Sequence, residues 1–246
     1  MDTQFKNIVV LTGAGISAES GIPVFRSETG LWESEKIEDV CVPSALIRNP
    51  RKVHDFYSKM RLSLQSRKPN PAHNAVALLQ AQWPALTGGS VTLVTQNIDD
   101  LHEKAGSKEV IHMHGELKSM FCSKCHGRWQ KDDASDPEDS CPLCKAHGTT
   151  RPDIVFFEEM PYKMDLIEKR LAKCELFLAI GTSGVVYPAA GFCSFAHSVG
   201  ALCVEFNLEA SAVGSQFDYG LYGKASATLS AFVKQLLADG TALREI

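Results

Sequence analysis

The sequence of 246 residues contains no apolar run near the roughly 20 residues that a membrane-spanning helix needs. No signal-peptide pattern is present either, because the first apolar run leads directly into glycines. Basic charge is not in excess: the formal net charge is −4, which argues against a general nucleic-acid-binding protein. Wholesale disorder is excluded by an apolar content of 44%. We therefore expect a globular protein of the cytoplasm with no membrane partner.

A disulfide framework is not expected, although the chain has eight cysteines. Such frameworks are typical of short secreted chains, whereas a chain of this length can bury a core without covalent crosslinks. Four cysteines stand apart, at Cys41, Cys174, Cys193 and Cys203. All but Cys41 lie in apolar contexts, where a buried free thiol is the usual interpretation.

The other four cysteines form two Cys-x-x-Cys pairs, Cys122 with Cys125 and Cys141 with Cys144. This spacing is typical of zinc, because two such turns can place four thiolates around one ion. Four sulfur ligands leave no position open for water, so we expect a structural Zn²⁺ site. The alternative is two unconnected pairs or redox thiols. Acidic residues outnumber basic ones around the pairs, which disfavours a zinc ribbon that binds nucleic acid.

Continuous apolar runs predict strands that are covered on both faces. The runs are Asn7–Leu11, Val91–Thr95, Val110–Met113, Asp153–Phe157, Leu176–Ile180 and Leu202–Phe206. Helix-like segments lie at Asn74–Gln82, Tyr162–Lys173, Pro188–His197 and Ala227–Ala238. Strands that alternate with helices indicate βαβ units, so the expected fold class is α/β with a parallel sheet.

Two regions interrupt this alternation and predict a smaller lobe. Phe25 to about Pro71 is rich in charge and helix formers, and Ser119 to Arg151 is polar and carries both cysteine pairs. A cleft between two lobes is a common place for ligands. We expect one unit, 1–246. The sheet domain is predicted in 1–24, 72–116 and 152–246, a helical insertion in 25–71 and a zinc-binding module in 117–151.

The first expected strand ends in the glycine-rich turn Gly13-Ala14-Gly15-Ile16-Ser17. Glycines in this place let backbone N–H groups approach a phosphate at a helix N-terminus, which favours a dinucleotide. Steric need alone also produces such turns. Ala18 replaces the third glycine of the standard pattern, and no acidic ribose ligand is evident at the end of a second strand. The turn therefore departs from that of hydride-transferring dehydrogenases.

Polar or glycine-rich segments follow four other predicted strands. They are Thr95–Asp99, His112–Gly115, Gly181–Pro188 and Glu205–Leu208. Amide and carboxylate side chains suit a carboxamide and ribose hydroxyls. His112 and His114 are expected to share one face of a strand and offer an imidazole for proton transfer. Each segment alone also fits a helix cap or a structural histidine. Together they predict one crevice at the carboxyl edge of the sheet.

The segments GAGISAESGIPVFR, TQNID, HMHGEL, GTSGVVYPAAG and EFNLE, with the paired Cys-x-x-Cys, occur in the order and spacing of the sirtuin family. Sirtuins are NAD-dependent protein deacylases, and the chain looks like their compact bacterial type over nearly its whole length. The resemblance implies a Rossmann-like domain with a small lobe made of a helical insertion and a zinc ribbon. It also implies that NAD is consumed, and that free lysine, nicotinamide and O-acyl-ADP-ribose are the products.

The resemblance further implies roles for individual residues. His114 would be the general base, and Asn97 would hold a ribose hydroxyl or an ordered water beside it, whereas His112 would be structural. Phe25 would shield the nicotinamide ribose, and Asp99 would receive the carboxamide. The full set implied to contact NAD is Gly13, Ala14, Gly15, Ser17, Ala18, Phe25, Arg26, Gln96, Asn97, Ile98, Asp99, Gly181, Thr182, Ser183, Asn207, Leu208 and Ala225.

An acyl-lysine protein or peptide would bind as an added strand, with Val155 on one side and Val185 and Val186 on the other. Glu158 stands where the family has glycine, so we expect an altered peptide preference, toward basic flanking residues. No nucleic-acid partner is expected, and the oligomeric state is left open.

The desuccinylase branch of the family carries Tyr-x-x-Arg on a helix. Here Tyr57 is followed by Met60 at the arginine position, and methionine offers a carboxylate no donor. We therefore expect neutral acyl groups to be preferred over succinyl. The alternative is that Met60 only packs and that Arg61 supplies the charge.

Other activities remain as alternatives. They are a mono-ADP-ribosyltransferase of the same family, a zinc-ribbon nucleic-acid-binding module and a nicotinamide-dependent dehydrogenase.

Overall fold

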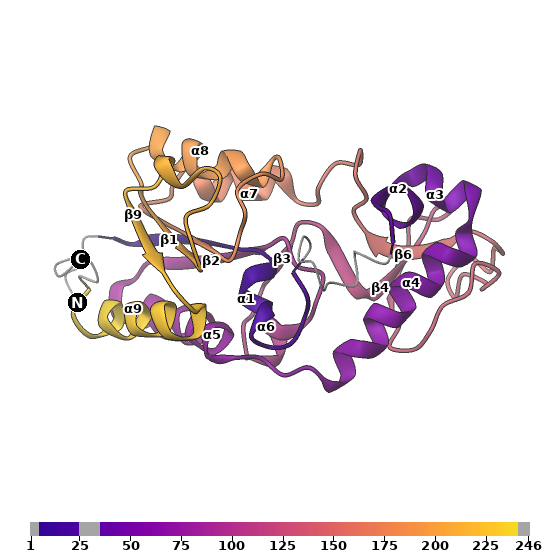
Figure 1. Cartoon of the computed structure of the whole chain (residues 1–246), viewed down its shortest axis with the longest axis horizontal. Coiled ribbons are helices and arrows are strands. Elements are labelled where there is room, and N and C mark those ends of the chain that lie inside the picture. Colours follow the sequence, from indigo (N-terminus) through magenta and orange to yellow (C-terminus); the bar gives the residue numbers. More distant parts are fainter. Residues whose placement is uncertain (1–4, 25–34, 241–246) are drawn as a thin grey trace.

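The computed structural model describes residues 5–24 and 35–240. Its larger sheet is parallel, with the strand order β3-β2-β1-β7-β8-β9 (Figure 1). The strands are β1 (Asn7–Thr12), β2 (Ser90–Thr95), β3 (Ile111–His112), β7 (Leu176–Ile180), β8 (Leu202–Asn207) and β9 (Tyr219–Tyr222). If these six strands are renumbered one to six along the chain, their order in the sheet is 3-2-1-4-5-6, which is that of doubly wound dinucleotide-binding folds. The strand order reverses between β1 and β7, and this position is called the switch point. The predicted α/β class is confirmed.

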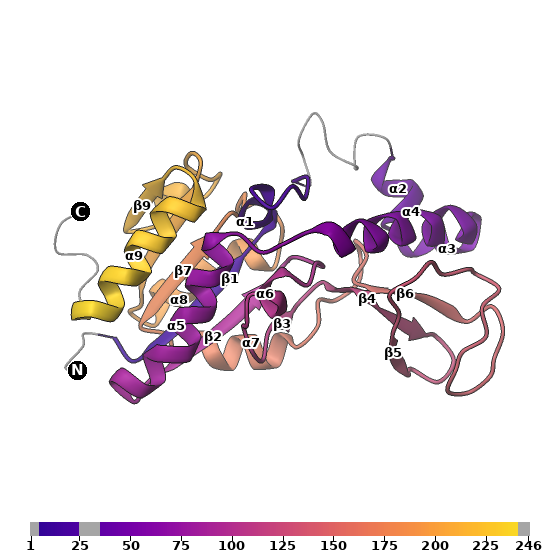
Figure 2. The same cartoon turned by 90° about the horizontal axis from the view of Figure 1, so that it is seen from below.

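Helices cover both faces of this sheet (Figures 1 and 2). They are α5 (Pro71–Thr87) and α9 (Ala225–Asp239) on one face, and α7 (Met164–Leu171) and α8 (Phe192–Ser198) on the other. Ile8 and Val10 of β1 join the core under α5 and α9, whereas Val9 and Leu11 join the core under α7 and α8. Because successive side chains of a strand point to opposite faces, the sequence of a strand that is covered on both faces is a continuous apolar run.

The N-terminal end of α5 is fixed beside the turn that follows β1. Asn70 caps α5 through its side chain, and Pro71 occupies the first helical position. The Asn70 amide also donates to the Ile16 carbonyl at 2.7 Å, within the short helix α1 (Ala14–Ala18). The cap of one helix therefore positions the other.

A smaller lobe occupies one end of the molecule (Figure 2). Its helices are α2 (Ile37–Val40), α3 (Pro43–Arg48) and α4 (Pro50–Ser63), and its antiparallel sheet contains β4 (Gly115–Cys122), β5 (Arg128–Gln130) and β6 (Thr150–Ile154) in the order β5-β4-β6. Val53 and Tyr57 of α4 share an apolar cluster with Leu117 of β4 and Ile154 of β6. Shorter elements elsewhere are η1 (Leu64–Ser66), α6 (Leu101–Lys104), η2 (Ala189–Gly191) and η3 (Gly214–Gln216).

One strand prediction was wrong, and one strand was missed. The run Asp153–Phe157 does not join the parallel sheet, because β6 pairs antiparallel with β4 in the small lobe. The sixth parallel strand is instead β9, whose sequence YGLY is half exposed at the sheet edge and too short to predict from apolar character.

No helix within the described ranges combines the length and apolar character that crossing a membrane requires.

Candidate active site

The loops after β1 and β7 touch at the switch point of the parallel sheet. Gly13 N donates to the Ile180 carbonyl and Gly15 N to the Gly181 carbonyl, both at 2.9 Å. A Cβ atom on Gly15 would lie 2.6 Å from Gly181 Cα. The glycines are therefore required by the contact between the two loops. They bring α1, which begins at Ala14 and ends at Ala18, to the edge of the sheet where this fold binds dinucleotides.

Ser17 of α1 is the centre of a buried hydrogen-bond network. Its Oγ donates to Asp99 Oδ2 at 2.9 Å and accepts from Asn97 Nδ2 at 3.2 Å. Asn97 Nδ2 also donates to the Gly13 carbonyl at 3.1 Å. Burial raises the pKa of Asp99, although its Oδ1 accepts the Leu101 N–H and its Oδ2 the Ser17 hydroxyl. The network joins the turn after β1 to the loop after β2.

Two buried histidines that sequence reasoning missed extend this network. His73 Nδ1 accepts the Asn70 N–H in the cap of α5, so Nε2 carries the proton and faces Ser17 Oγ at 3.4 Å. His102 Nε2 lies 3.0 Å from Thr12 Oγ1, and the two imidazole rings are 5.0 Å apart. Burial lowers the pKa of His73 to about 4 and that of His102 to about 3, so both are neutral at pH 7.

A sequence signal existed for one of them. Asn70-Pro71-x-His73 before an apolar helix is a capping pattern, which marks His73 as part of a helix start. Nothing local marks His102 as buried.

Gln96 connects two other groups of predicted site residues. Its Nε2 donates to Thr182 Oγ1 at 3.1 Å, in the loop after β7. Its carbonyl faces His114 Nδ1, also at 3.1 Å. The neighbouring Ile98 packs, partly buried, against the apolar cluster of the small lobe. The loop after β2 therefore reaches both the large sheet and the small lobe.

His114 has one ring nitrogen engaged and the other available. Because Nδ1 faces a carbonyl oxygen, it carries the proton, and Nε2 is left as the basic atom. Within the described residues, Nε2 has no hydrogen-bond partner. Burial lowers the pKa of His114, and the bond to the Gln96 carbonyl only partly offsets that effect. The His114 carbonyl accepts the Val155 N–H at 2.9 Å. A neutral imidazole with a free Nε2 is the state that a general base requires.

The prediction that His112 and His114 share a strand face was wrong. β3 ends at His112, and His114 lies in the turn before β4, so the alternation of a strand does not reach it. His112 Nε2 bonds Glu103 Oε1 at 2.8 Å, and Nδ1 faces the Asn97 carbonyl at 3.1 Å. Burial acts to lower the pKa of His112, but the hydrogen bond and charge of Glu103 raise it. Both nitrogens of His112 are held, which fits the structural role expected of it.

The residues predicted to hold the adenosine half lie around the loops after β7 and β8. Asn207 Nδ2 donates to the Thr182 carbonyl at 3.1 Å and lies 3.3 Å from Glu205 Oε2. Glu205 is fully buried and accepts the Tyr222 hydroxyl at 2.8 Å. Sequence reasoning gave Glu205 no role, yet it fixes the Asn207 amide. The others of this group are Ser183 and Leu208, both exposed, and Ala225, buried at the start of α9.

The two residues predicted to select the acyl group, Tyr57 and Met60, are buried on α4. Tyr57 stacks on Phe156 with ring centroids 5.8 Å apart, and Met60 belongs to the same apolar cluster. In the described part of the chain, the Tyr57 hydroxyl faces the Cys41 thiol but has no hydrogen-bond partner of ordinary geometry. The predicted peptide residues are arranged with Val155 bonded to His114, Val185 exposed and Val186 half-buried.

Arg61 bonds groups within 117–151, the module that carries the cysteine pairs. Its Nε donates to the Leu117 carbonyl at 2.5 Å and its Nη1 to the Asp133 carbonyl at 3.0 Å, while Nη2 contacts Met120 Sδ at 3.3 Å. The side chain is fully buried. Its donors hold α4 on β4 and on the loop that follows β5.

The four cysteines predicted to ligate a metal converge, with their sulfurs within 4.8 Å of one another. Cys122 Sγ and Cys144 Sγ are 3.8 Å apart, as are Cys125 Sγ and Cys141 Sγ. A tetrahedral zinc ion with Zn–S bonds of about 2.3 Å requires sulfurs about 3.8 Å apart. The arrangement fits that ion.

The two Cys-x-x-Cys turns repeat one backbone geometry. His126 N donates to the Cys122 carbonyl and Lys145 N to the Cys141 carbonyl, both at 2.9 Å. His126 and Lys145 also both have left-handed backbones, with φ of 58° and 64°. Two matching turns of this kind present four sulfurs to one centre.

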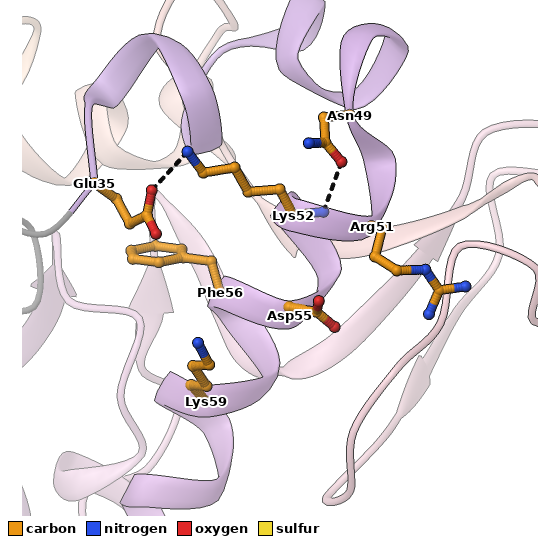
Figure 3. Close-up of a pocket in the computed structure, with 7 residues that line it drawn as sticks. All are labelled: Glu35, Asn49, Arg51, Lys52, Asp55, Phe56 and Lys59. Atoms are coloured by element: carbon orange, nitrogen blue, oxygen red, sulfur yellow. Dashed lines mark hydrogen bonds and ion pairs between the residues drawn. The ribbon is translucent and has the colours of Figure 1, made fainter.

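A surface pocket of about 370 Å³ lies on the helical insertion, apart from the predicted site residues (Figure 3). It is lined by Glu35, Asn49, Arg51, Lys52, Asp55, Phe56 and Lys59. Lys52 bonds Glu35 at 2.7 Å and Asp39 at 3.0 Å there. This mixed-charge surface includes none of the residues predicted for the NAD site. Phe25 and Arg26, predicted for the NAD site, lie outside the described residues.

Known proteins resemble this chain over nearly its whole length. The Sir2 family model matches residues 13–188. The NAD-dependent protein deacylase SIR2rp3 of Leishmania major is 51% identical, with 94% of this chain and 96% of the relative covered. The NAD-dependent protein deacylase of Vibrio vulnificus (strain YJ016) is 48% identical, with 97% and 96% covered.

Solved structures agree with these matches. A Sir2 homologue in complex with NAD superposes with a TM-score of 0.85 at 35% identity, covering 96% of this chain and 92% of that one. A Sir2 protein with a deacetylated p53 peptide and 3'-O-acetyl ADP-ribose superposes with a TM-score of 0.78 at 29% identity, covering 96% and 94%.

Proposed function

The chain belongs to the Sir2 family, and from that premise we propose how its crevice performs NAD-dependent protein deacylation. The activity itself is supported by relatives about half identical over almost the entire chain, which carry the name NAD-dependent protein deacylase. The mechanism is supported above all by His114, which is neutral and has Nε2 free. His114 bonds Gln96 through Nδ1 and Val155 through its backbone carbonyl. The nucleic-acid and ADP-ribosyltransferase alternatives are not favoured.

We infer that NAD lies at the switch point, over the turn after β1. Gly13, Ala14, Gly15, Ser17 and Ala18 would border its pyrophosphate and the adjoining ribose. The turn fits this role because its glycines bring backbone N–H groups to the carboxyl edge of the sheet. Thr182 and Asn207, already fixed to each other, would hold the adenosine half together with Gly181, Ser183, Leu208 and Ala225. Phe25 and Arg26 remain part of the proposal.

The nicotinamide end would be received by the network around Ser17. Asp99 and Ile98 would take its carboxamide, and Gln96 and Asn97 would hold ribose hydroxyls or an ordered water. NAD would supply an activated ribose carbon, from which nicotinamide leaves as the acyl oxygen bonds to it, and a neighbouring ribose hydroxyl, to which the acyl group is finally transferred. The buried network suits this because the Ser17 hydroxyl and the Leu101 N–H fix Asp99 before any ligand arrives, so little reorganisation is needed.

His114 would take the proton from a ribose hydroxyl during acyl transfer. Its lowered pKa keeps Nε2 unprotonated near pH 7, and the bond from Nδ1 to the Gln96 carbonyl fixes the ring orientation. General-base catalysis of this kind contributes about 10²- to 10⁴-fold. Asn97 would assist through the hydroxyl or water that it holds.

The acyl-lysine substrate would enter between the lobes as an added strand, between Val155 and the Val185–Val186 segment. Backbone pairing gives affinity with little demand on sequence. Glu158 lies beside this path with a positive φ of 75°, which a non-glycine residue rarely adopts. Its exposed carboxylate would favour basic residues that flank the modified lysine.

The acyl group would be neutral rather than succinyl. Tyr57 and Met60 lie in an apolar cluster, and the donors of the neighbouring Arg61 are bound to backbone carbonyls of the other module. A succinyl carboxylate buried there without a cation would bear a desolvation cost with no compensation.

The four-cysteine cluster would hold a structural Zn²⁺ ion, whose role is to keep the two Cys-x-x-Cys turns together. We also propose the division into a sheet domain (1–24, 72–116, 152–246), a helical insertion (25–71) and a zinc-binding module (117–151). Both β4 and β6 cross the limits of the zinc-binding module, so these two strands connect it to the sheet domain. A location in the cytoplasm remains a prediction from sequence, which fractionation would test.

The proposal is tested by incubating the full chain with NAD and an acetyl-lysine peptide, with products followed by mass spectrometry. One nicotinamide and one O-acetyl-ADP-ribose should form for each lysine freed. Formation of NADH, release of free acetate as the primary product, or ADP-ribose attached to the peptide would each contradict it.

A further inference from the structure

A second group of metal-binding side chains lies away from the crevice, between α8 and β8. It consists of Cys193 and His197 of α8 and Cys203 of β8, whose ligand atoms lie within 4.8 Å of one another. Cys193 and His197 are four residues apart and therefore share one face of the helix. Cys203 is the second residue of β8, so this group is at the amino end of the strand, opposite the edge that gathers the predicted NAD residues.

The histidine of this group is oriented by a carboxylate. His197 Nε2 lies 2.9 Å from Asp218 Oδ2, and the same oxygen accepts the Cys203 N–H at 2.7 Å. Histidines that bind metals characteristically have a carboxylate partner, which fixes the ring. Asp218 would act either in this way or as a ligand itself. Sequence reasoning identified two buried free thiols here but not the histidine and carboxylate that meet them.

The group borders solvent through His197 and its partner Asp218. Cys193 and Cys203 are buried, but the side chains of His197 and Asp218 are 36% and 38% exposed. Beside them is a surface pocket of about 480 Å³, lined by Phe5, Glu175, Gly200, Ala201, Leu202 and Asp218. The exposed imidazole of His197 and carboxylate of Asp218 therefore give an ion its first contacts at the surface.

We propose that Cys193, His197 and Cys203 form a second cation site, selective for a thiophilic ion such as Zn²⁺. Two sulfurs and one imidazole nitrogen are a ligand set that suits zinc and disfavours Mg²⁺ or Ca²⁺. The thiols now donate weakly to backbone carbonyls, Cys193 Sγ to Gln216 at 3.3 Å and Cys203 Sγ to Cys193 at 3.7 Å. Binding replaces these contacts by metal–sulfur bonds and releases both thiol protons to solvent.

The test is a Co²⁺ titration of the full chain, reduced and with zinc already in the four-cysteine cluster. We expect one further Co²⁺ per chain and a thiolate-to-cobalt charge-transfer band, while the zinc content stays constant. His197→Gln should weaken Co²⁺ binding at least tenfold, and Cys203→Ala should remove the band. Cys174→Ala is the matched control: this cysteine is buried in the same apolar cluster but is not one of the ligands, so its titration should match that of the unmodified chain.

The absence of a further Co²⁺ equivalent in the unmodified chain would overturn the proposal. The proposal would also be overturned if His197→Gln bound Co²⁺ as tightly as the unmodified chain does, or if a Cys193–Cys203 disulfide persisted under the reducing conditions. If Cys203→Ala fails to fold, the Co²⁺ affinity of His197→Gln decides between the outcomes, because His197 is exposed and its substitution should leave the fold intact.

Discussion

The substitution Met60→Arg tests how the crevice selects an acyl group. Met60 lies three residues after Tyr57 on α4, and both side chains enter the apolar cluster that also contains Phe156. Arginine at this position would place a guanidinium beside the Tyr57 hydroxyl. The existing Arg61 does not do this, because it bonds the Leu117 carbonyl on β4.

The expected gain follows from the strength of a charged contact. Hydrogen bonds between a guanidinium and a carboxylate contribute about 1.5–3 kcal/mol, equivalent to about 10- to 150-fold in kcat/KM. We expect the lower part of this range for a succinyl peptide. Met60 is only 8% exposed, so an arginine there loses hydration before the substrate arrives.

The assay compares kcat/KM for acetyl and succinyl peptides of one sequence. The unmodified chain should prefer acetyl, and Met60→Arg should raise the succinyl value about tenfold while lowering the acetyl value. Met60→Gln is the control: glutamine is similar in size but uncharged, and it should not raise kcat/KM for the succinyl peptide. A wild-type chain that handles succinyl as well as acetyl would refute the reasoning, as would equal gains from arginine and glutamine.

Further predictions concern the base, the loop contact, the metal cluster and the buried arginine. Because burial lowers the pKa of His114 below its ordinary value of 6.5, kcat/KM should be constant around neutral pH and fall only as pH drops through that lower value; a decline that starts above about pH 7 would contradict this. Gly181→Ala should cost about 1–3 kcal/mol in urea unfolding and raise the KM for NAD, since its φ is 63° and a Cβ would meet α1; unchanged values would refute the contact. Cys141→Ala should lose the bound zinc and lower the melting temperature, which metal analysis and calorimetry would show; full zinc occupancy would exclude the four-sulfur site. Arg61→Met should destabilise the chain by about 2–4 kcal/mol without changing the ratio of acetyl to succinyl rates, whereas a selective loss of succinyl activity would show that Arg61 supplies the charge.

The parallel sheet could be predicted because its central strands are buried on both faces. β1, β7 and β8 each show a continuous apolar run, and they form the middle of the sheet with β2. The edge strand β9 escaped prediction because half of its residues are exposed and one is glycine. β6 pairs with β4 because the chain returns to β4 after the cysteine turns. This pairing joins residues far apart in the sequence, so a local sequence pattern cannot reveal it.

Individual site residues were predictable where their chemistry is local. The cysteine spacing anticipated the converging sulfurs, and the polar strand ends anticipated the residues around Asn97. His73 and His102 were missed because only the folded chain brings α5 to Ser17 and α6 to α5. The different settings of His112 and His114 depended on where β3 ends, and a single sequence does not fix that boundary.

The most direct test of the account is the deacylation rate of His114→Ala at saturating NAD, beside the unmodified chain. We expect a loss of at least 100-fold in the rate of lysine release, with an unchanged melting temperature and retained NAD binding. A folded variant that releases lysine at the original rate would contradict the central claim, because the proton would then be taken by another group.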